Sequence, residues 1–238
     1  MTSSDFSRLK WRQTDFRTRR AVVEKLDDQE LLAKIAIHDD DYHVRESAVK
    51  KLNDPALLAE IARNDKDYHV RRTAVRELDD QALLAELAKN DSDSGVRESA
   101  VKKLNDRALL AEIARNDKDY HVRRAAVEEL DDQALFSEIA QNDDDYHVRE
   151  SAVKKLKDRV LLGKIAETDK NSWVRRVAVE KVTDQKLLAD IAMNDKDSWV
   201  REIAVKKVSD QMLLDELAQK STDRYIRKAA LEKIGKKA

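Results

Sequence analysis

The sequence predicts an all-α repeat protein built from stacked pairs of short helices, and three observations support this. Three glycines and one proline in 238 residues, with charged residues making up 40% of the chain, fit a helical protein better than a sheet. Each repeat contains two apolar patterns with helical spacing. The dipeptide Val44-Arg45 returns at one constant interval along the chain, which is typical of a repeat architecture. The equivalent pairs are Val70/Arg71, Val96/Arg97, Val122/Arg123, Val148/Arg149, Val174/Arg175 and Val200/Arg201.

The first helix of each repeat, helix A, is expected to begin directly after an aspartate. The carboxylate of Asp54 can accept hydrogen bonds from the free N–H groups of the first turn, which predicts an N-cap. Pro55 suits the first helical position. One apolar stripe follows, formed by Leu57, Leu58, Ile61 and Ala62. The equivalent aspartates are Asp28, Asp80, Asp106, Asp132, Asp158, Asp184 and Asp210.

The second helix, helix B, is expected to begin after Asp41, whose place Asn171 takes in one repeat. Its buried stripe is predicted to consist of Val44, Ala48, Val49 and Leu52. Alanine recurs at the position of Ala48, as expected where two helix backbones approach closely. Helices of about ten residues are too short to be stable alone in water. Stacking of neighbouring repeats must therefore stabilise them.

The repeats are expected to fill almost the whole chain. We predict an N-terminal capping helix in residues 1–15, eight 26-residue repeats in residues 16–223, and a C-terminal half-repeat cap in residues 224–238. Phe6 and Leu9 stand where Leu58 and Ile61 stand two periods later. The count is therefore about nine repeats, the last of half length. Terminal repeats of this kind need a polar outer face.

Composition argues against several classes of function. The 47 basic and 48 acidic side chains leave a net charge of −1, so no overall field would attract nucleic acid or an anionic membrane. Without cysteine the chain has no disulfide, thiolate nucleophile or Cys-ligated zinc. It shows neither a signal peptide nor 18 consecutive apolar residues. We expect a soluble, cytoplasmic monomer that uses no cofactor.

Within this pattern, an Asp-x-x-x-x-x-Arg motif precedes a Val-Arg-x-x-Ala-Val helix, as in Asp65 and Arg71. It resembles the HEAT repeat, and the resemblance covers nearly the whole chain. It implies a right-handed α-solenoid in which these residues form a hydrogen-bonded ladder between successive repeats and helix B lines the concave face. The 26-residue repeat is short for that family. The bacterial leucine-rich repeat variant is similar too, but its N-terminal cysteine cluster for iron–sulfur binding is absent here.

The repeated arginines have two interpretations, a ladder to aspartate or contacts to phosphate. The residue after each Val-Arg pair alternates in sign along the chain, and four residues later the signs are mostly reversed. Every repeat except the one with Arg72 and Arg76 is therefore expected to carry an i,i+4 ion pair on helix B. This alternation argues against a continuous basic groove, so we expect no nucleic-acid partner.

The repeated histidines could suggest metal ligands or a dyad of His43 with Ser47. One histidine per repeat, about 10 Å from the next, cannot converge on a zinc ion whose bonds are about 2.1 Å long. A serine and a histidine on one helix, without an orienting acid or oxyanion donors, make no catalytic triad. We therefore predict no catalytic residue and no metal site. The repeated histidines are expected to be partly exposed residues at the starts of the B helices.

The character of the repeats changes near the C-terminus, where aromatic residues replace histidine and β-branched residues replace serine one turn later. Stacking would bring them into one apolar strip, and Trp and Tyr are common anchors of protein interfaces. The predicted partner-binding residues are Trp173, Val177, Trp199, Ile203 and Tyr225. The alternative is that each tryptophan fills an inter-repeat pocket, because Ser172 replaces the preceding tyrosine. Gly95 with Ser94 lacks any aromatic side chain, which predicts an under-filled pocket or a local bend in the fourth repeat.

We therefore predict a non-enzymatic scaffold that binds a protein or peptide on its helix B face. The variable positions, represented by His43, Glu46, Ser47, Lys50 and Lys51, would determine specificity. A designed or consensus repeat scaffold without a natural partner is one alternative, because residues 42–67 and 94–119 differ at only three places. A HEAT-like enzyme acting on nucleic acid, or a lyase, is another, and the alternating charges argue against it.

Overall fold

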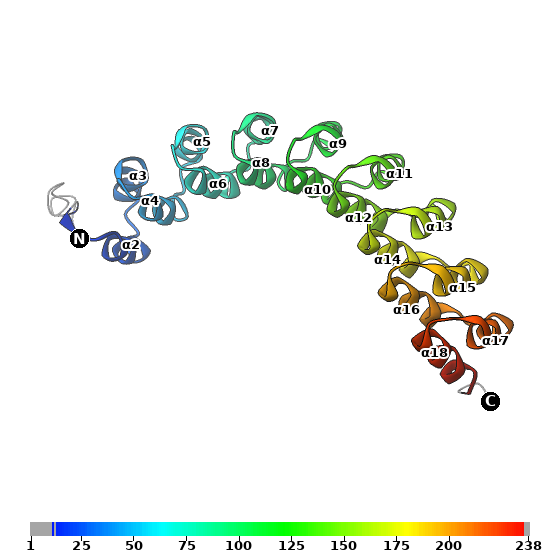
Figure 1. Cartoon of the computed structure of the whole chain (residues 1–238). Coiled ribbons are helices and arrows are strands. Elements are labelled where there is room, and N and C mark those ends of the chain that lie inside the picture. The colour runs from blue at the N-terminus through cyan, green and yellow to red at the C-terminus, as the bar shows by residue number, and fades with distance from the viewer. Residues whose placement is uncertain (1–10, 12, 236–238) are drawn as a thin grey trace. The chain divides into compact units, whose positions relative to one another are not determined.

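The computed structural model describes residue 11 and residues 13–235, and these residues form seventeen helices without a β-strand (Figure 1). The predicted all-α repeat fold is confirmed. Most of the predicted capping helix, including Phe6 and Leu9, lies outside the described residues. The chain divides into two compact units, an N-terminal unit that ends at Glu129 and a C-terminal unit that begins at Leu130.

The helices alternate between the two predicted types and are eight to twelve residues long. The A helices are α3 (Gln29–His38), α5 (Pro55–Asn64), α7 (Gln81–Asn90), α9 (Arg107–Asn116), α11 (Gln133–Asn142), α13 (Arg159–Thr168), α15 (Gln185–Asn194) and α17 (Gln211–Lys220). The B helices are α2 (Phe16–Glu24), α4 (Tyr42–Val49), α6 (Tyr68–Glu77), α8 (Ser94–Val101), α10 (Tyr120–Glu129), α12 (Tyr146–Lys155), α14 (Ser172–Lys181), α16 (Ser198–Lys207) and α18 (Arg224–Gly235).

The helices begin at the predicted caps. The Asp54 carboxylate accepts hydrogen bonds from the N–H groups of Ala56 at 2.9 Å and Leu57 at 3.2 Å, with Pro55 in the first turn. On helix B, Asp41 accepts from the N–H of His43 at 2.9 Å. The side chain of Asn171 performs the same task for α14. Each cap satisfies N–H groups that have no partner inside the helix.

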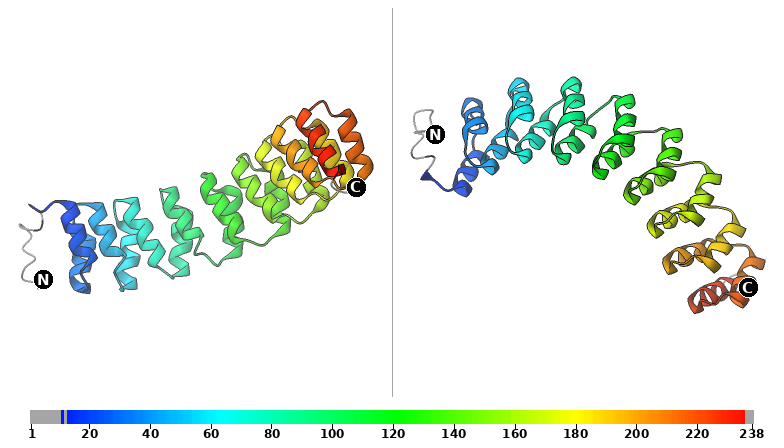
Figure 2. Two further views of the ribbon diagram at one scale, coloured as in Figure 1. Left: turned by 90° about the horizontal axis from the view of Figure 1, so that it is seen from below. Right: turned by 45° about the horizontal axis from the view of Figure 1, so that its top comes forward.

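Within each unit every A helix packs on the B helix that follows it, and consecutive B helices pack on one another (Figure 2). The B helices form the more tightly packed row, because Ala48 and its equivalents are completely buried and let the backbones approach. Val44, Val49 and Leu52 complete this buried stripe as predicted. On helix A, Leu58, Ile61 and Ala62 are buried, whereas Leu57 is half-buried.

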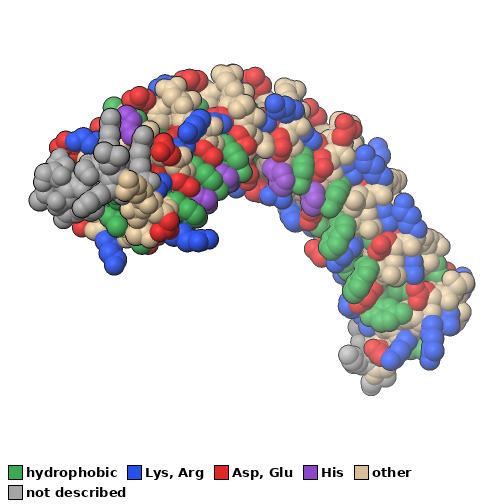
Figure 3. Space-filling view, turned by 60° about the vertical axis from the view of Figure 1, so that its left-hand side comes forward, with side chains coloured by type: hydrophobic (Ala, Val, Ile, Leu, Met, Phe, Trp, Pro, Cys, Tyr) green, Lys and Arg blue, Asp and Glu red, His purple; other side chains and the backbone are tan. Residues whose placement is uncertain are grey.

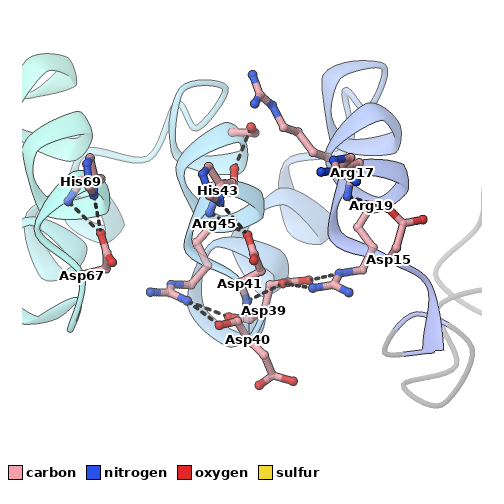
Figure 4. Close-up of polar contacts among 12 residues, drawn as sticks. Asp15, Arg17, Arg19, Asp39, Asp40, Asp41, His43, Arg45, Asp67 and His69 are labelled. Atoms are coloured by element: carbon pink, nitrogen blue, oxygen red, sulfur yellow. Dashed lines mark hydrogen bonds and ion pairs between the residues drawn. The ribbon is translucent and has the colours of Figure 1, made fainter.

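A ladder of buried ion pairs connects successive repeats. Arg45 is 2% exposed and donates from Nε and Nη2 to the carboxylate of Asp65 in the next repeat, at 2.8 and 2.9 Å. Its Nη1 donates to the backbone carbonyl of Asp39, at 3.0 Å. Figure 4 shows this backbone contact and the preceding rung, in which Arg19 donates to the Asp39 carboxylate. The ladder implied by the HEAT resemblance is present, but the carboxylate comes from 20 residues ahead of the arginine rather than from the aspartate six residues before it.

The ladder changes its partner at the C-terminal end. Ser221 stands where the other repeats have the ladder aspartate, and it has no carboxylate to offer. Arg201 therefore donates to the N-cap of α18, Asp223, at 3.1 and 2.7 Å. The two side chains are 19% and 25% exposed, compared with 2% and 5% for Arg175 and Asp195 in the rung before. The last rung is thus the more solvated one.

The substitution Arg201→Ala should raise the pKa of Asp223 towards its ordinary value. The hydrogen bond from Arg201 holds the pKa of this carboxyl below its usual range. Because the pKa is lowered in the folded state, the pair stabilises α18 above the pKa of the unfolded chain, and this stabilisation is lost as the pH falls through the folded value. Carboxyl NMR titration of both proteins measures the change. An unchanged pKa in the variant would show that Arg201 does not hold the carboxylate.

A second set of contacts connects the C-terminal ends of neighbouring B helices. Lys51 Nζ donates to the carbonyl of Glu24 at 3.0 Å, and Lys181 Nζ donates to the carbonyls of Lys154 and Leu156, both at 2.6 Å. These lysines satisfy carbonyls that have no partner inside their own helix. Lys51 is one of the predicted specificity positions, but its ammonium group connects two repeats.

Candidate binding surface

The five predicted partner-binding residues occupy two sets of equivalent positions on three neighbouring B helices of the C-terminal unit. Trp173 lies on α14, Trp199 on α16 and Tyr225 on α18, and their side chains are 54%, 60% and 47% exposed. Val177 and Ile203 are half-buried one turn after the two tryptophans. We call these five residues the aromatic strip. Figure 3 shows hydrophobic side chains following one another along this face, with charged groups between them.

The guanidinium of Arg176 lies between the two tryptophans. Its Cζ atom is 4.3 Å from the centroid of the Trp173 ring and 5.8 Å from that of Trp199. The predicted i,i+4 ion pair with Glu180 is not formed, although both residues are described. The expectation of an ion pair was therefore wrong in this repeat, because two indole faces attract the guanidinium and cover it. The other predicted pairs include Glu46–Lys50, Arg124–Glu128 and Glu202–Lys206, which are present.

The contact of Arg176 with Trp199 has a counterpart in the following repeat. In both places the residue after the Val-Arg pair contacts the residue two places after the N-cap of the next B helix. In α16 the residue after the Val-Arg pair is Glu202. Its carboxylate accepts a hydrogen bond from the Tyr225 hydroxyl at 3.0 Å and pairs with Lys206 at 2.5 Å. The Lys206 hydrogen bond, with that of Tyr225, lowers the pKa of Glu202. Trp199 and Tyr225 are thereby each oriented by a charged group of the preceding repeat.

Between the two tryptophans the surface is hollowed. The hollow has a volume of about 420 Å³ and is lined by Ser172, Trp173, Arg176, Asp197 and Trp199. Burial alone would raise the pKa of Asp197, but hydrogen bonds from the Val200 N–H and the Ser172 hydroxyl lower it. Ser172 therefore leaves space where four other repeats have tyrosine, at positions 42, 68, 120 and 146, and it holds the cap of the next helix. The hollow joins an aromatic wall to one positive and one negative group.

Histidine and tyrosine form a column of rings at the corresponding positions of the N-terminal unit. The centroid of the His43 ring lies 5.4 Å from that of Phe16 and 3.8 Å from that of Tyr42. The ring centroids of Tyr42 and His69 are 5.1 Å apart. The hydroxyl of Ser47 donates to the backbone carbonyl of His43 at 2.9 Å and not to its ring. Both histidines are partly exposed at helix starts, as predicted. The part of the chain that is described holds no cluster of three His, Cys, Asp or Glu able to bind a metal ion.

These observations define the class of the protein: it is a helical repeat protein with an α-solenoid fold and a side-chain ladder between repeats. No model of a protein family matches the chain, and no curated protein matches it either.

Solved structures agree with this class. A leucine-rich repeat variant with a novel repetitive structural motif is 26% identical, with a TM-score of 0.70, over 92% of this chain and 83% of its own. The E. coli protein YIBA is 19% identical, with a TM-score of 0.54, over 93% of this chain and 97% of its own. The predicted likeness to helical repeat proteins is therefore confirmed. Among the described residues no helix has the length and apolar character needed to cross a membrane.

Proposed function

We propose that the protein is a non-enzymatic scaffold that binds a peptide segment of a partner protein along the aromatic strip. The observation that carries this proposal is the exposure of Trp173, Trp199 and Tyr225, which is 47% or more on three adjacent helices. Large aromatic side chains in water cost solvation free energy and are the residues that most often anchor interfaces. Ladder ion pairs of Arg175 and Arg201 connect the repeats that carry them. A surface that is ordered before binding loses little entropy when a ligand docks.

The chemistry of the strip indicates the kind of peptide. Indole faces on both sides of the hollow favour apolar or aromatic side chains, and the opposite charges of Arg176 and Asp197 in the same hollow favour a polar group that can bond to both. Glu202 and Lys206 already neutralise one another one repeat further on. We therefore infer a peptide in which a polar residue is flanked by apolar or aromatic ones.

The free protein should show two accessible tryptophans and one shielded tryptophan. Trp11 is 9% exposed and its Nε1 donates to Asp39 at 2.6 Å, whereas Trp173 and Trp199 are more than half exposed. Acrylamide quenching of fluorescence, compared among the variants Trp11→Phe, Trp173→Phe and Trp199→Phe, distinguishes the three. Shielding of Trp173 and Trp199 in the absence of any partner would exclude the aromatic strip as a binding site.

Binding itself is tested by selection from a displayed peptide library on the full chain. Peptides selected on the protein should lose about tenfold or more in affinity for Trp173→Ala or Trp199→Ala, because aromatic anchors dominate such interfaces. The matched control is Tyr68→Ala, which removes an exposed ring of 40% accessibility from the N-terminal unit and should leave binding unchanged. Gly95 occupies the equivalent place to the tryptophans in α8, so a small residue there is compatible with the fold. Selected peptides that bind all variants equally would contradict the proposal.

A further inference from the structure

Helix α6 carries two arginines one turn apart, Arg72 and Arg76, where other B helices carry a pair of opposite charges. Residues four apart lie on the same face of a helix. Arg20 is paired with Glu24 at 3.2 Å and Arg124 with Glu128 at 3.5 Å. Within residues 13–235, neither Arg72 nor Arg76 makes an ion pair, and the Nε atom of Arg72 is buried without a hydrogen-bond acceptor.

The acidic groups nearest to this pair in the repeat pattern already have partners. Glu46 in the repeat before is bound by Lys50 at 2.8 Å and by the Thr73 hydroxyl at 3.2 Å. Glu98 in the repeat after is bound by Lys102 at 2.5 Å. Asp93 caps α8 by accepting from the Val96 N–H at 3.1 Å. The two guanidinium groups therefore remain as uncompensated positive charge on this face of the N-terminal unit.

Gly95 leaves the Arg72 guanidinium uncovered. A Cβ atom built on Gly95 would lie 3.1 Å from Asp93 Oδ1, 3.6 Å from Arg72 Nη1 and 3.7 Å from Arg72 Cδ, so a longer side chain here would begin in contact with the arginine and with the capping carboxylate. The equivalent arginine of α14, Arg176, is covered there by the ring of Trp199. On α4 and α6 the position of Gly95 holds the stacked rings of His43 and His69.

Three arginines, each two repeats from the next, occupy the same position on their B helices and can be compared directly. Arg72, Arg124 and Arg176 each have a buried Nε without a hydrogen-bond acceptor. Arg124 has the Glu128 carboxylate beside it, and Arg176 has two indole rings. Arg72 has neither, although it stands in the same place on its helix. Among the described residues, Arg72 is therefore the one of these three arginines whose guanidinium has neither an ion-pair partner nor an aromatic ring against it.

We propose that Arg72 and Arg76, on the face where Gly95 supplies no side chain to cover them, form a binding site for a phosphate group. A phosphate monoester carries a charge of about −2 and several acceptor oxygens, and guanidinium forks bind such groups through paired hydrogen bonds. The ion pairs Glu46–Lys50 and Glu98–Lys102 enclose the two arginines on either side. This arrangement fits one dianionic group rather than the row of phosphates in a nucleic-acid strand. The site uses no residue of the aromatic strip.

The experiment observes the arginine side chains directly. Resonances of the Nε–Hε groups in the full chain are followed by NMR at constant ionic strength during titration with inorganic phosphate, and separately with N-acetylphosphoserine amide. We expect Arg72 to shift in a saturable way with both probes. Stronger binding of the phosphoserine probe assigns the site to a phosphorylated side chain, and equal or stronger binding of inorganic phosphate assigns it to the free anion. Acetate and a dinucleotide phosphodiester, which are monoanions, should bind more weakly.

Two variants copy arrangements that the chain uses elsewhere and should therefore fold. Arg76→Glu reproduces the pair Arg124–Glu128, and Gly95→His restores the ring present at His69. Each should weaken phosphate binding by about tenfold or more, because a charge-assisted hydrogen bond is lost or its space is filled. The control is Arg63→Glu, which makes the same change of charge on α5, where Arg63 pairs with Glu86 at 3.1 Å, and it should bind phosphate like the wild type.

The proposal is overturned if Arg72 fails to shift with phosphate or if acetate or the phosphodiester binds as tightly as phosphate. It is also overturned if Arg63→Glu weakens binding as much as Arg76→Glu, since the effect would then reflect overall charge. Because the probes are small anions that need no tryptophan, failure of peptide binding at the aromatic strip would leave this result unaffected.

Discussion

Replacing Arg175 by methionine should lower the free energy of unfolding of the C-terminal unit by about 3–5 kcal/mol, because it leaves a buried carboxylate without its partner. Arg175 is 1% exposed and donates to the Asp195 carboxylate through Nε and Nη2, both at 2.8 Å. Its Nη1 also donates to the carbonyl of Asp169, at 2.9 Å. One substitution therefore removes two hydrogen bonds to the next repeat and one within its own repeat.

The size of this loss is checked by urea denaturation, with hydrogen exchange used to locate it on α14 and α15. The matched variant is Arg201→Met, in which the side chains of the pair are 19% and 25% exposed, so water can solvate the abandoned Asp223 and the loss should be smaller. The double variant Arg175→Met with Asp195→Asn should recover part of the stability, since it removes the buried charge and keeps an oxygen that accepts from the Asp197 N–H. A loss below about 1 kcal/mol for Arg175→Met would show that the ladder holds only the register of the repeats.

The substitution Phe136→Ala should cost about 3–5 kcal/mol, because it opens a cavity in the core of a single repeat. Phe136 is completely buried on α11, at a position where the other A helices carry leucine. The Nζ atom of Lys155 lies 5.4 Å from the centroid of its ring, so a cation–π contact is lost as well. The equivalent leucines are Leu32, Leu58, Leu84, Leu110, Leu162, Leu188 and Leu214.

Hydrogen exchange is the informative measurement for this variant, because repeats contact mainly their neighbours and open locally. Protection should fall in α11, α12 and α13 and stay high in α17. Phe136→Leu should cost less than about 1.5 kcal/mol, since it restores the residue that the other repeats use. Val160→Ala, at a side chain that is 84% exposed on α13, should change nothing measurable. Uniform loss of protection along the chain after Phe136→Ala would contradict local stacking.

Most of the helical architecture could be predicted because it depends on short-range chemistry. An aspartate before an apolar stripe, as at Asp54, identifies a helix start through the N–H groups it can bind. The alanine at position 48 indicated close packing of the B helices before their contacts were known. The aromatic strip was also predicted as a set, since helical spacing and a fixed period place Trp173 and Trp199 at equivalent positions.

The contacts between repeats were less accessible to sequence analysis. Lys51 and Lys181 bind backbone carbonyls of the preceding B helix. Every residue has such a carbonyl, so the sequence does not indicate which of them lacks a hydrogen-bond partner. Arg176 has a glutamate four residues later that could pair with it. Its guanidinium nevertheless contacts the indole rings, because the next B helix places Trp199 beside it. Spacing within one helix predicts an ion pair, but it gives no information about an aromatic ring that belongs to the next repeat and competes for the same guanidinium.

The sequence by itself determined the fold class, the 26-residue repeat, the helix starts and the buried stripes, because these follow from periodicity and from capping within a few residues. Only the tertiary structure decided that the carboxylate of Asp65 rather than that of Asp39 pairs with Arg45, that the tryptophans stay exposed, and that the buried Nε of Arg72 has no hydrogen-bond acceptor. The physical reason is that each of these outcomes depends on how far one repeat is displaced from the next. That displacement is set by packing between side chains that are distant in sequence.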